Sequence, residues 1–398
     1  MSLLRLALVV LLGLVGFLYY AVVRAPRPRR GWAIVAAVAL TAVLASAVSW
    51  LFIDRYVDNL DRWRWLTGSM AMLMPVVFYA GLGLGLVAIV NLVWWIARDA
   101  RGQRLARADV IRTPRLRFVR WATAGSLAVA VALTGYGYAE AHRPALTSVS
   151  VSSADLPAQF DGFRIALLTD VHVGVGLGRS FVQGLVDQIN DANVDLVAIA
   201  GDLSNGTPAQ LGDDLMPLTQ LHASFGVLVT TGNHEYDTSA QAWIDWLNAH
   251  DLPVLDNSGV VLSRGTASID VLGVNDRTGR APHNDDLQTA VSNLSAQFGV
   301  PVDGAGRFRL LIAHQPLQDA GSSTRAAELG VDVQLSGHTH GGQIWPLHYA
   351  MTMQQPVLDG THVLNGVTVV TGRGAGAWGP PVRVGAPPEI PVVTLHRA

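Results

Sequence analysis

The 398-residue sequence contains neither cysteine nor lysine, so all 28 of its basic residues are arginine. The absence of cysteine excludes thiol nucleophiles, zinc–thiolate sites and disulfides. The absence of lysine excludes catalysis through a Schiff base and nucleotide binding by a P-loop lysine. Charged residues of every kind are also scarce, at 15% of the chain compared with roughly 25% in soluble domains. We therefore expect part of the chain to lie outside water.

The charges that are present divide the chain in two. Residues 1–143 contain 17 arginines and 6 acids, a net charge of +11, whereas residues 144–398 contain 11 arginines and 24 acids, a net charge of −13. The long apolar runs all lie in the first region. We therefore predict two domains, a membrane anchor in residues 1–143 and an acidic domain facing water in residues 144–398.

Four apolar runs in the first domain are long enough to cross a bilayer. They are residues 6–23, 31–53, 73–96 and 121–138. Because a helix needs about 20 residues to cross ~30 Å of hydrocarbon, we predict an all-α bundle of four transmembrane helices. Buried core helices are the alternative, but they are usually shorter than about 14 residues. The fourth run contains several glycines and is the weakest of the four.

The arginines between these runs predict the orientation of the protein. Residues 24–30 contain four arginines and residues 98–120 contain eight. Short cytoplasmic loops accumulate basic residues, so both segments are expected on the cytoplasmic side. We thus predict a multi-pass protein of the cell membrane in which everything after Tyr138 is extracytoplasmic. If the fourth run does not cross, the acidic domain lies in the cytoplasm instead.

The acidic domain follows a polar stretch at residues 140–159 and alternates short apolar segments with helical ones. The predicted strands are residues 164–169, 194–200, 226–231, 269–274, 309–313 and 331–335. Each is a short run of mostly β-branched or aliphatic residues. Residues 179–190 and 240–249 have helical periodicity. This alternation predicts an α/β domain.

Polar motifs follow five of these strands. In chain order they are Asp170-Val-His172, Gly201-Asp202, Gly232-Asn233-His234-Glu235, His314 and Gly337-His338-Thr339-His340-Gly341-Gly342. Because the carboxyl ends of strands in an α/β sheet line one crevice, these side chains are expected to converge. Each motif alone is commonly a turn or a structural histidine. Together, two carboxylates, one amide and four imidazoles form a ligand set suited to borderline divalent metals.

The order of these motifs resembles the calcineurin-like metallophosphoesterase family. Its signature of Asp-x-His, Gly-Asp, Gly-Asn-His-(Asp/Glu), His and Gly-His-x-His is intact within residues 147–397. Residues 341–346 and 383–390 also look like the membrane-anchored bacterial branch of that family. The resemblance implies a four-layer αββα sandwich as the fold. It implies metal-dependent hydrolysis of a phosphate ester or phosphodiester as the activity.

The resemblance further implies a role for each residue of the motifs. One metal would be held by Asp170, His172 and His340, the other by Asn233, His314 and His338, with Asp202 bridging both. The cofactors would be two divalent ions, with Mn, Fe or Zn expected. A carboxylate can bridge because it has two acceptor oxygens, and an amide offers a neutral carbonyl oxygen. A hydroxide held by both metals would then attack phosphorus, with no covalent enzyme intermediate.

His234 is adjacent to a predicted ligand and is predicted to be catalytic. It would protonate the leaving-group oxygen or stabilise charge on the phosphoryl group, with Glu235 or a nearby acid orienting it. A purely structural imidazole is the alternative. Arg373 and Trp378 lie in a Gly/Pro-rich loop, residues 371–381, which could cover the site or only close the fold.

The sequence is also compatible with functions other than hydrolysis of a simple phosphoester. A hydrolase of a lipid-linked or nucleotide-sugar pyrophosphate is the alternative within enzymes. A membrane sensor or assembly module with a retired site would predict missing ligands, and none is missing from the sequence. Nucleic acid is disfavoured as a partner, because phosphate backbones are bound by basic surfaces and this domain carries −13. We expect a phosphate-containing small molecule or lipid.

Overall fold

The computed structural model describes residues 64–100, 108–280, 282–318, 321–355 and 357–398, together with residues 34, 37, 38, 40, 41 and 45. It divides into two compact units, Met1–Gly137 and Tyr138–Ala398. The predicted span at residues 6–23 and most of the one at residues 31–53 lie outside the described residues.

The described residues of the first unit are helical, apart from the turn at Met72. Its helices are α3 (Arg64–Ala71), α4 (Leu73–Ala100) and α5 (Ala108–Ala141). Two stretches, Thr67–Trp94 and Pro114–Ala141, are long and apolar enough to cross a membrane. Only 28% and 17% of their most apolar windows are buried, whereas a core helix of a soluble protein would be mostly buried. The described part of the chain therefore supports the third and fourth of the four predicted spans.

Polar side chains within these two helices are satisfied locally. The side chains of Asn91, Ser126 and Thr134 each donate a hydrogen bond of 2.8 Å to the carbonyl oxygen four residues earlier. Gly83 of α4 lies against α5, where a Cβ would come within 2.8 Å of Ser126 Cβ. Small residues and internally bonded polar groups are what helix packing in hydrocarbon requires.

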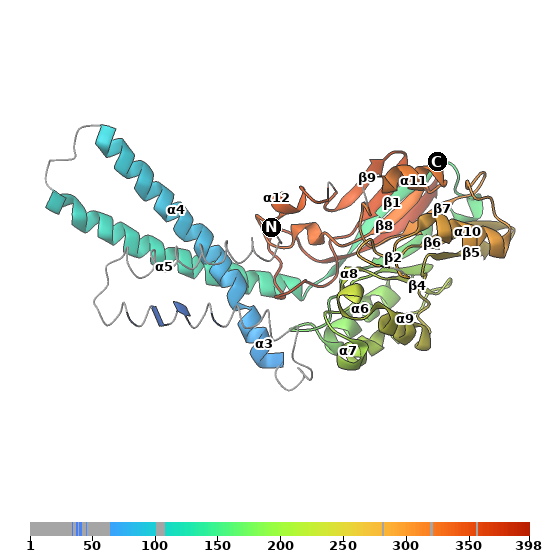
Figure 1. Cartoon of the computed structure of the whole chain (residues 1–398), viewed down its shortest axis with the longest axis horizontal. Coiled ribbons are helices and arrows are strands. Elements are labelled where there is room, and N and C mark those ends of the chain that lie inside the picture. The colour runs from blue at the N-terminus through green and yellow to red at the C-terminus, as the bar shows by residue number, and fades with distance from the viewer. Residues whose placement is uncertain are drawn as a thin grey trace. The chain divides into compact units, whose positions relative to one another are not determined.

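The second unit is built on two mixed sheets (Figure 1). The first sheet has the order β1-β11-β2-β3-β4, and the second has the order β5-β6-β7-β8-β10-β9. In the first sheet the strands are β1 (Ala145–Ser153), β2 (Phe163–Leu168), β3 (Leu196–Ala200), β4 (Val227–Thr230) and β11 (Glu389–Arg397). In the second they are β5 (Ser258–Arg264), β6 (Ala267–Gly273), β7 (Arg309–Ile312), β8 (Val333–Ser336), β9 (Gly360–Leu364) and β10 (Val367–Thr371). Strands β2, β3 and β4 are parallel to one another, as are β6, β7, β8 and β10.

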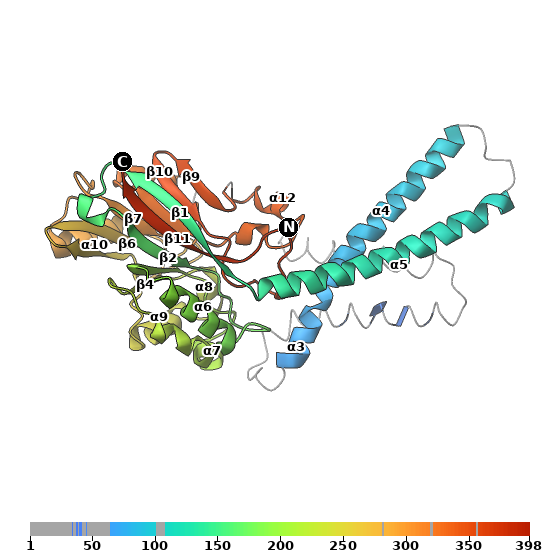
Figure 2. The same ribbon diagram turned by 180° about the vertical axis from the view of Figure 1, so that it is seen from behind.

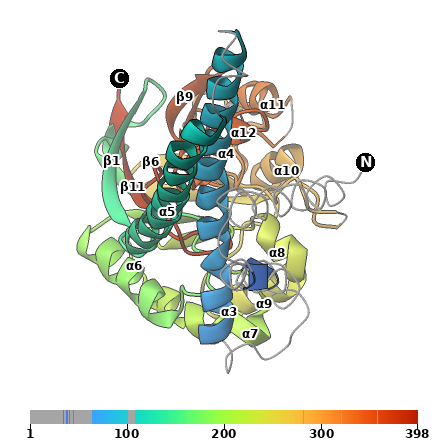
Figure 3. The ribbon, with the colours of Figure 1, turned by 90° about the vertical axis from the view of Figure 1, so that its left-hand side faces the viewer.

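Helices cover the outer face of each sheet (Figures 2 and 3). The described helices of this unit are α6 (Arg179–Asp191), α7 (Pro208–Leu215), α8 (Asn233–Thr238), α9 (Ala240–Ala249), α10 (Leu287–Phe298), α11 (Ser322–Glu328) and α12 (His348–Met351). Helices α6, α7 and α9 pack on the first sheet, and α10 and α11 pack on the second. Helix α9 has the predicted bounds.

Buried apolar residues on each strand alternate between two cores. On β2, Ile165 and Leu167 point into the core between the sheets, whereas Ala166 and Leu168 point into the core beneath α6, α7 and α9. Strand β7 does the same, with Leu310 facing the first sheet and Leu311 facing α10 and α11. A strand buried on both faces has a continuous apolar sequence, and such runs predict these strands. The predicted α/β sandwich is thus confirmed.

Five strands were not predicted, and β1 shows why. It lies in the stretch at residues 140–159 that was identified only as polar, because serine and threonine alternate with apolar residues along it. Strand β1 is at the edge of its sheet and pairs only with β11. An edge strand with one exposed face tolerates polar side chains, so its composition resembles that of a loop.

Candidate metal centre

The motifs converge at the carboxyl ends of the parallel strands, as predicted. Asp170, Asp202 and Asn233 follow β2, β3 and β4 of the first sheet, while His314 and His338 follow β7 and β8 of the second. Three groups of donor atoms lie within 4.8 Å of one another: Asp170, His172 and His340; His172, Asp202 and His234; Asp202, His314 and His338. The structure therefore places side chains from both sheets in one centre.

The first cluster brings two imidazoles onto one carboxylate oxygen. Asp170 Oδ1 lies 3.2 Å from His340 Nε2 and 3.8 Å from His172 Nε2, and the two ring nitrogens are 3.0 Å apart. This buried oxygen finds no hydrogen-bond partner among the described residues. Burial alone would raise the pKa of Asp170, but the charges of His340 and His314 lower it below its ordinary value. An ionised, unpartnered oxygen facing two imidazoles fits a cation.

The second cluster is centred on His314. Its Nε2 lies 3.2 Å from Asp202 Oδ2, 3.2 Å from Asn233 Oδ1 and 3.3 Å from His338 Nδ1. Its other nitrogen, Nδ1, lies 2.7 Å from the carbonyl oxygen of Ala200. A backbone acceptor at Nδ1 fixes the tautomer that leaves Nε2 free to bind a metal.

Asp202 lies between the two clusters. Its Oδ2 is 3.6 Å from His172 Nε2 of the first cluster and 3.2 Å from His314 Nε2 of the second. Its Oδ1 accepts the backbone N–H of His234 at 2.8 Å. Burial would raise the pKa of Asp202, but the nearby charge of His314 holds it well below the ordinary range. An ionised carboxylate in this place faces both groups of imidazoles.

The backbone at the centre is strained. Among the predicted ligands, positive φ occurs at Asp170 (55°), His172 (49°), Asp202 (54°), His338 (71°) and His340 (53°). This left-handed region is uncommon for residues with a side chain and costs of order 1–3 kcal/mol at each. Such residues cluster at functional sites, where the surrounding fold holds them in place.

Glycines beside the ligands make room for them. A Cβ on Gly232 would lie 2.2 Å from Asp202 Oδ1, and a Cβ on Gly337 would lie 2.3 Å from Asp170 Oδ2. Both distances are far below van der Waals contact. The glycines in the Gly-Asn-His and Gly-His motifs are therefore required by the close approach of the carboxylates.

Glu235 does not orient the imidazole of His234, contrary to the expectation from the sequence. Its buried carboxylate accepts the backbone N–H groups of Asp202 at 3.0 Å, Leu203 at 2.8 Å and Gly232 at 2.7 Å. Burial and the charge of Asp202 raise the pKa of Glu235 to about 7, although the three N–H groups act in the opposite direction. Glu235 therefore joins the second motif to the third.

His234 lies at the rim of the centre and is half-buried. Its ring is 4.6 Å from the ring of His172, at an interplanar angle of 86°, and 6.5 Å from the ring of Trp378. The loop at residues 371–381 therefore brings Trp378 towards the centre. Arg373 of the same loop is held elsewhere, by Glu389 at 2.6 Å and Asp359 at 3.3 Å.

Two supporting residues were missed by the sequence analysis. Asn205 Oδ1 lies 2.9 Å from His172 Nδ1, which frees Nε2 of that ring for the centre. Arg383 is fully buried and donates from Nη1 to the carbonyl oxygen of His340 and from Nε to that of Gly376, both at 2.8 Å. Burial lowers the pKa of Arg383 to about 9. The family resemblance of residues 383–390, which begin with Arg383, was the sequence signal that could have indicated this role.

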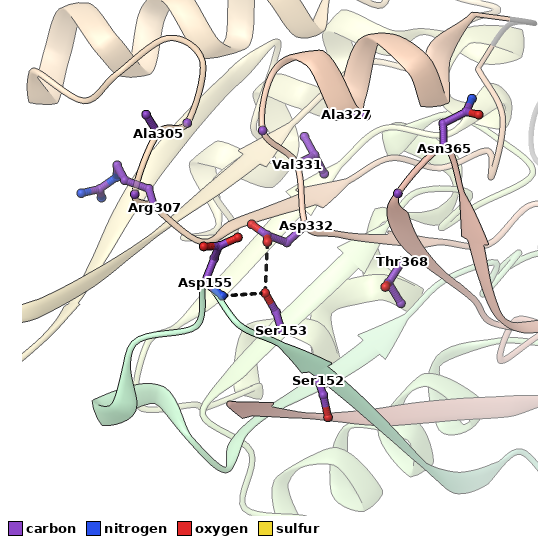
Figure 4. Close-up of a pocket in the computed structure, with 14 residues that line it drawn as sticks. Ser152, Ser153, Asp155, Ala305, Arg307, Ala327, Val331, Asp332, Asn365 and Thr368 are labelled. Atoms are coloured by element: carbon purple, nitrogen blue, oxygen red, sulfur yellow. Dashed lines mark hydrogen bonds between the residues drawn. The ribbon is translucent and has the colours of Figure 1, made fainter. Parts of the chain in front are cut away.

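A cavity of about 440 Å³ lies at the opposite end of the strands (Figure 4). It is bordered by Ala327 and residues 330–332, which precede β8, and by residues 304–307, which precede β7. Its polar groups bond one another: Ser153 Oγ donates to Asp332 Oδ1, and the N–H of Asp155 donates to Ser153 Oγ, both at 3.1 Å. This cavity is separate from the metal centre.

Comparison with known proteins identifies the family. Residues 163–342 match the model of the calcineurin-like phosphoesterase family. A transmembrane protein with a metallophosphoesterase domain from Danio rerio is 27% identical over 93% of this chain and 82% of its own. The metallophosphoesterase YkuE of Bacillus subtilis is 32% identical over 66% of this chain and 90% of its own. A metallophosphoesterase of Helicobacter pylori strain J99 is 34% identical, and the match spans 59% of its length. The chain therefore belongs to the calcineurin-like metallophosphoesterases and has the phosphoesterase function of that family.

Proposed function

We propose that the chain hydrolyses a phosphate ester or phosphodiester using two divalent metal ions. The observation that carries this proposal is the position of Asp202 Oδ2, which lies within 3.6 Å of an imidazole from each cluster. A carboxylate between two sets of donors that consist mainly of imidazoles is the arrangement that a two-metal site needs, because its charge offsets both cations.

The proposed ligand set follows the two clusters. One ion is held by Asp170, His172 and His340, the other by Asn233, His314 and His338, and Asp202 contacts both. Support comes from the atoms on the far side of these ligands. His172 Nδ1 contacts Asn205 Oδ1, and His314 Nδ1 contacts the carbonyl oxygen of Ala200. Asp170 Oδ2 accepts the backbone N–H of His338 at 2.9 Å. Only their remaining atoms face the centre.

The donors are oxygen and nitrogen throughout, which suits Mn, Fe or Zn. When bound, the two ions activate water and stabilise charge on the oxygens of phosphorus. His234 then holds a proton on its imidazole at the rim and passes it to the leaving-group oxygen. Asn205 positions the ring of His172, and Arg383 positions the backbone of His340.

The membrane assignment is also part of the proposal. Residues 1–143 form a multi-pass anchor and residues 144–398 form the catalytic domain on the extracytoplasmic side. Support comes from the two candidate spans, the arginine-rich segments and the relative from Danio rerio, which is described as a transmembrane protein. A lipid-linked or nucleotide-sugar pyrophosphate is the second candidate substrate. A membrane sensor or assembly module with an inactive site is disfavoured, because the side chains of all seven predicted ligands lie in the two clusters.

Metal removal tests the proposal. The full chain is purified in detergent, stripped with a chelator and reloaded with Mn²⁺, Fe²⁺ or Zn²⁺. Turnover of p-nitrophenyl phosphate and of its bis-ester is measured at each stage. We expect activity only in the reloaded protein. Undiminished turnover by a verified metal-free preparation would exclude the two-metal mechanism. The variant Asp187→Asn, at an exposed position of α6, serves as a control and should behave like the wild type.

A further inference from the structure

A stretch without acids or arginines contains the last ligand motif and continues beyond it. Residues 333–358 contain no aspartate, glutamate or arginine, in a domain that carries 24 acids and 11 arginines. The middle of this stretch, residues 345–354, contains α12 and is here termed the rim segment. Its sequence is Trp-Pro-Leu-His-Tyr-Ala-Met-Thr-Met-Gln.

The rim segment turns large apolar side chains towards solvent. Trp345 is 53% exposed, Leu347 42%, Tyr349 67% and Met353 82%. Trp378 of the neighbouring loop is 61% exposed. Single exposed apolar residues are ordinary, but five such residues on two segments that are hydrogen-bonded through Gln343 are a concentration that marks an interaction surface.

Backbone hydrogen bonds hold the rim segment in this conformation. The N–H of Trp345 donates to the carbonyl oxygen of Val384 at 2.8 Å. The carbonyl oxygen of Leu347 accepts the N–H groups of Ala350 at 2.9 Å and Met351 at 3.1 Å. The exposure of the apolar side chains is therefore a property of the fold and not of a loose loop.

Gln343, two residues before the rim segment, connects that segment to Trp378. The side-chain amide of Gln343 donates to the carbonyl oxygen of Trp378 at 2.8 Å and accepts its N–H at 2.9 Å. Gln343 is joined to the ligand motif through Gly341 and Gly342, and its own N–H donates to the carbonyl oxygen of His340. Because the Trp378 ring is 6.5 Å from that of His234, the apolar surface reaches the mouth of the centre.

We propose that the rim segment and Trp378 are a membrane-contact surface that inserts into the interfacial layer of a lipid bilayer. Tryptophan and tyrosine are enriched at this layer, and methionine and leucine bury there at little cost. A domain at −13 is repelled by anionic lipids, so an uncharged surface is where it can approach a bilayer. Only residues 142–144 separate α5 from β1, so the chain itself keeps a bilayer close.

Insertion of this surface brings the metal centre to the level of the lipid headgroups. A phosphate held in the membrane then lies within reach of His234, a consequence that rests on the proposed hydrolase function. The contact surface itself does not depend on that function.

Site-specific labelling tests the contact directly, since the chain has no native cysteine. Met353→Cys and Tyr349→Cys are introduced singly into the full chain, labelled with an environment-sensitive fluorophore and reconstituted into phosphatidylcholine nanodiscs containing one chain each. Phe298→Cys, at an exposed apolar position where α10 ends, is the matched control. Quenching by lipids brominated in their acyl chains is then measured.

We expect strong quenching at positions 349 and 353 and little at position 298. Equal quenching at all three positions, or none at 349 and 353, would overturn the proposal. If the fluorophores at positions 349 and 353 enter an apolar environment only in vesicles that hold many chains, and not in nanodiscs, the surface binds a second copy of the chain instead. The measurement needs no turnover, so it stands even if the proposed hydrolase activity fails.

Discussion

The carboxylate of Glu235 accepts the backbone N–H of Asp202 at 3.0 Å and that of Gly232 at 2.7 Å, so one side chain fixes the spacing of two motifs. We predict that Glu235→Gln destabilises the domain, because the glutamine NH₂ group must face N–H donors. A loss of about 1–3 kcal/mol is expected, the usual cost of an unsatisfied buried polar group. Denaturant unfolding of the full chain in detergent measures it, with Asp187→Asn as the control. Unchanged stability would show that the loops hold their spacing without Glu235.

Asp202→Ala is expected to lose both metals and nearly all turnover. Without the carboxylate, two cations would face each other with nothing between them to offset their charges. Elemental analysis after gel filtration, together with the p-nitrophenyl phosphate assay, measures both effects. Full metal content in this variant would contradict the bridging role.

His234→Ala is expected to keep its metals while turnover falls by roughly 10²–10⁴-fold, the usual contribution of a positioned proton donor or charge stabiliser. The metal content of this variant is informative because a ring nitrogen of His234 lies within 4.8 Å of donor atoms of His172 and Asp202, so the three could share one ion. A variant that has lost metal would reassign His234 as a ligand. A substrate with a better leaving group should restore part of the turnover if His234 supplies the proton.

Gly232→Ala tests the close approach at the third motif. Its Cβ would lie 2.2 Å from Asp202 Oδ1, so the carboxylate or the loop must move. We expect about 1–3 kcal/mol of destabilisation from this overpacking, together with weaker metal retention. Gly184→Ala in α6 is the matched control, since a Cβ there meets nothing within 4 Å and alanine favours a helix. Equal behaviour of the two variants would argue against a steric requirement.

A reporter fusion after His142 tests the orientation. Alkaline phosphatase at this point should be active and a reporter that works only in the cytoplasm should be inactive, because the arginine-rich segments after the first and after the third predicted span are expected inside the cell. The opposite pattern would return the catalytic domain to the cytoplasm. It would also favour a cytosolic lipid precursor as substrate.

The family and the α/β sandwich could be recognised from the sequence because their signals are local. Strands such as β2 and β7 are buried on both faces, so they read as continuous apolar runs. Asp170 and His338 lie 168 residues apart, but each directly follows such a run, and the carboxyl ends of parallel strands meet at one edge. Edge strands such as β1 carry no comparable signal.

Only the tertiary structure decided what each side chain of the centre contacts. Glu235 follows His234 in the chain, yet its oxygens bond the backbone at Asp202 and Leu203, more than 30 residues earlier. Arg383 and Asn205 support ligands with which they share no motif, and the uncharged rim segment is exposed because it folds outside both sheets. A sequence motif specifies residue types and spacing along the chain. Hydrogen-bond partners depend on the distance in space between segments remote in sequence, and that distance is set by the packing of the two sheets.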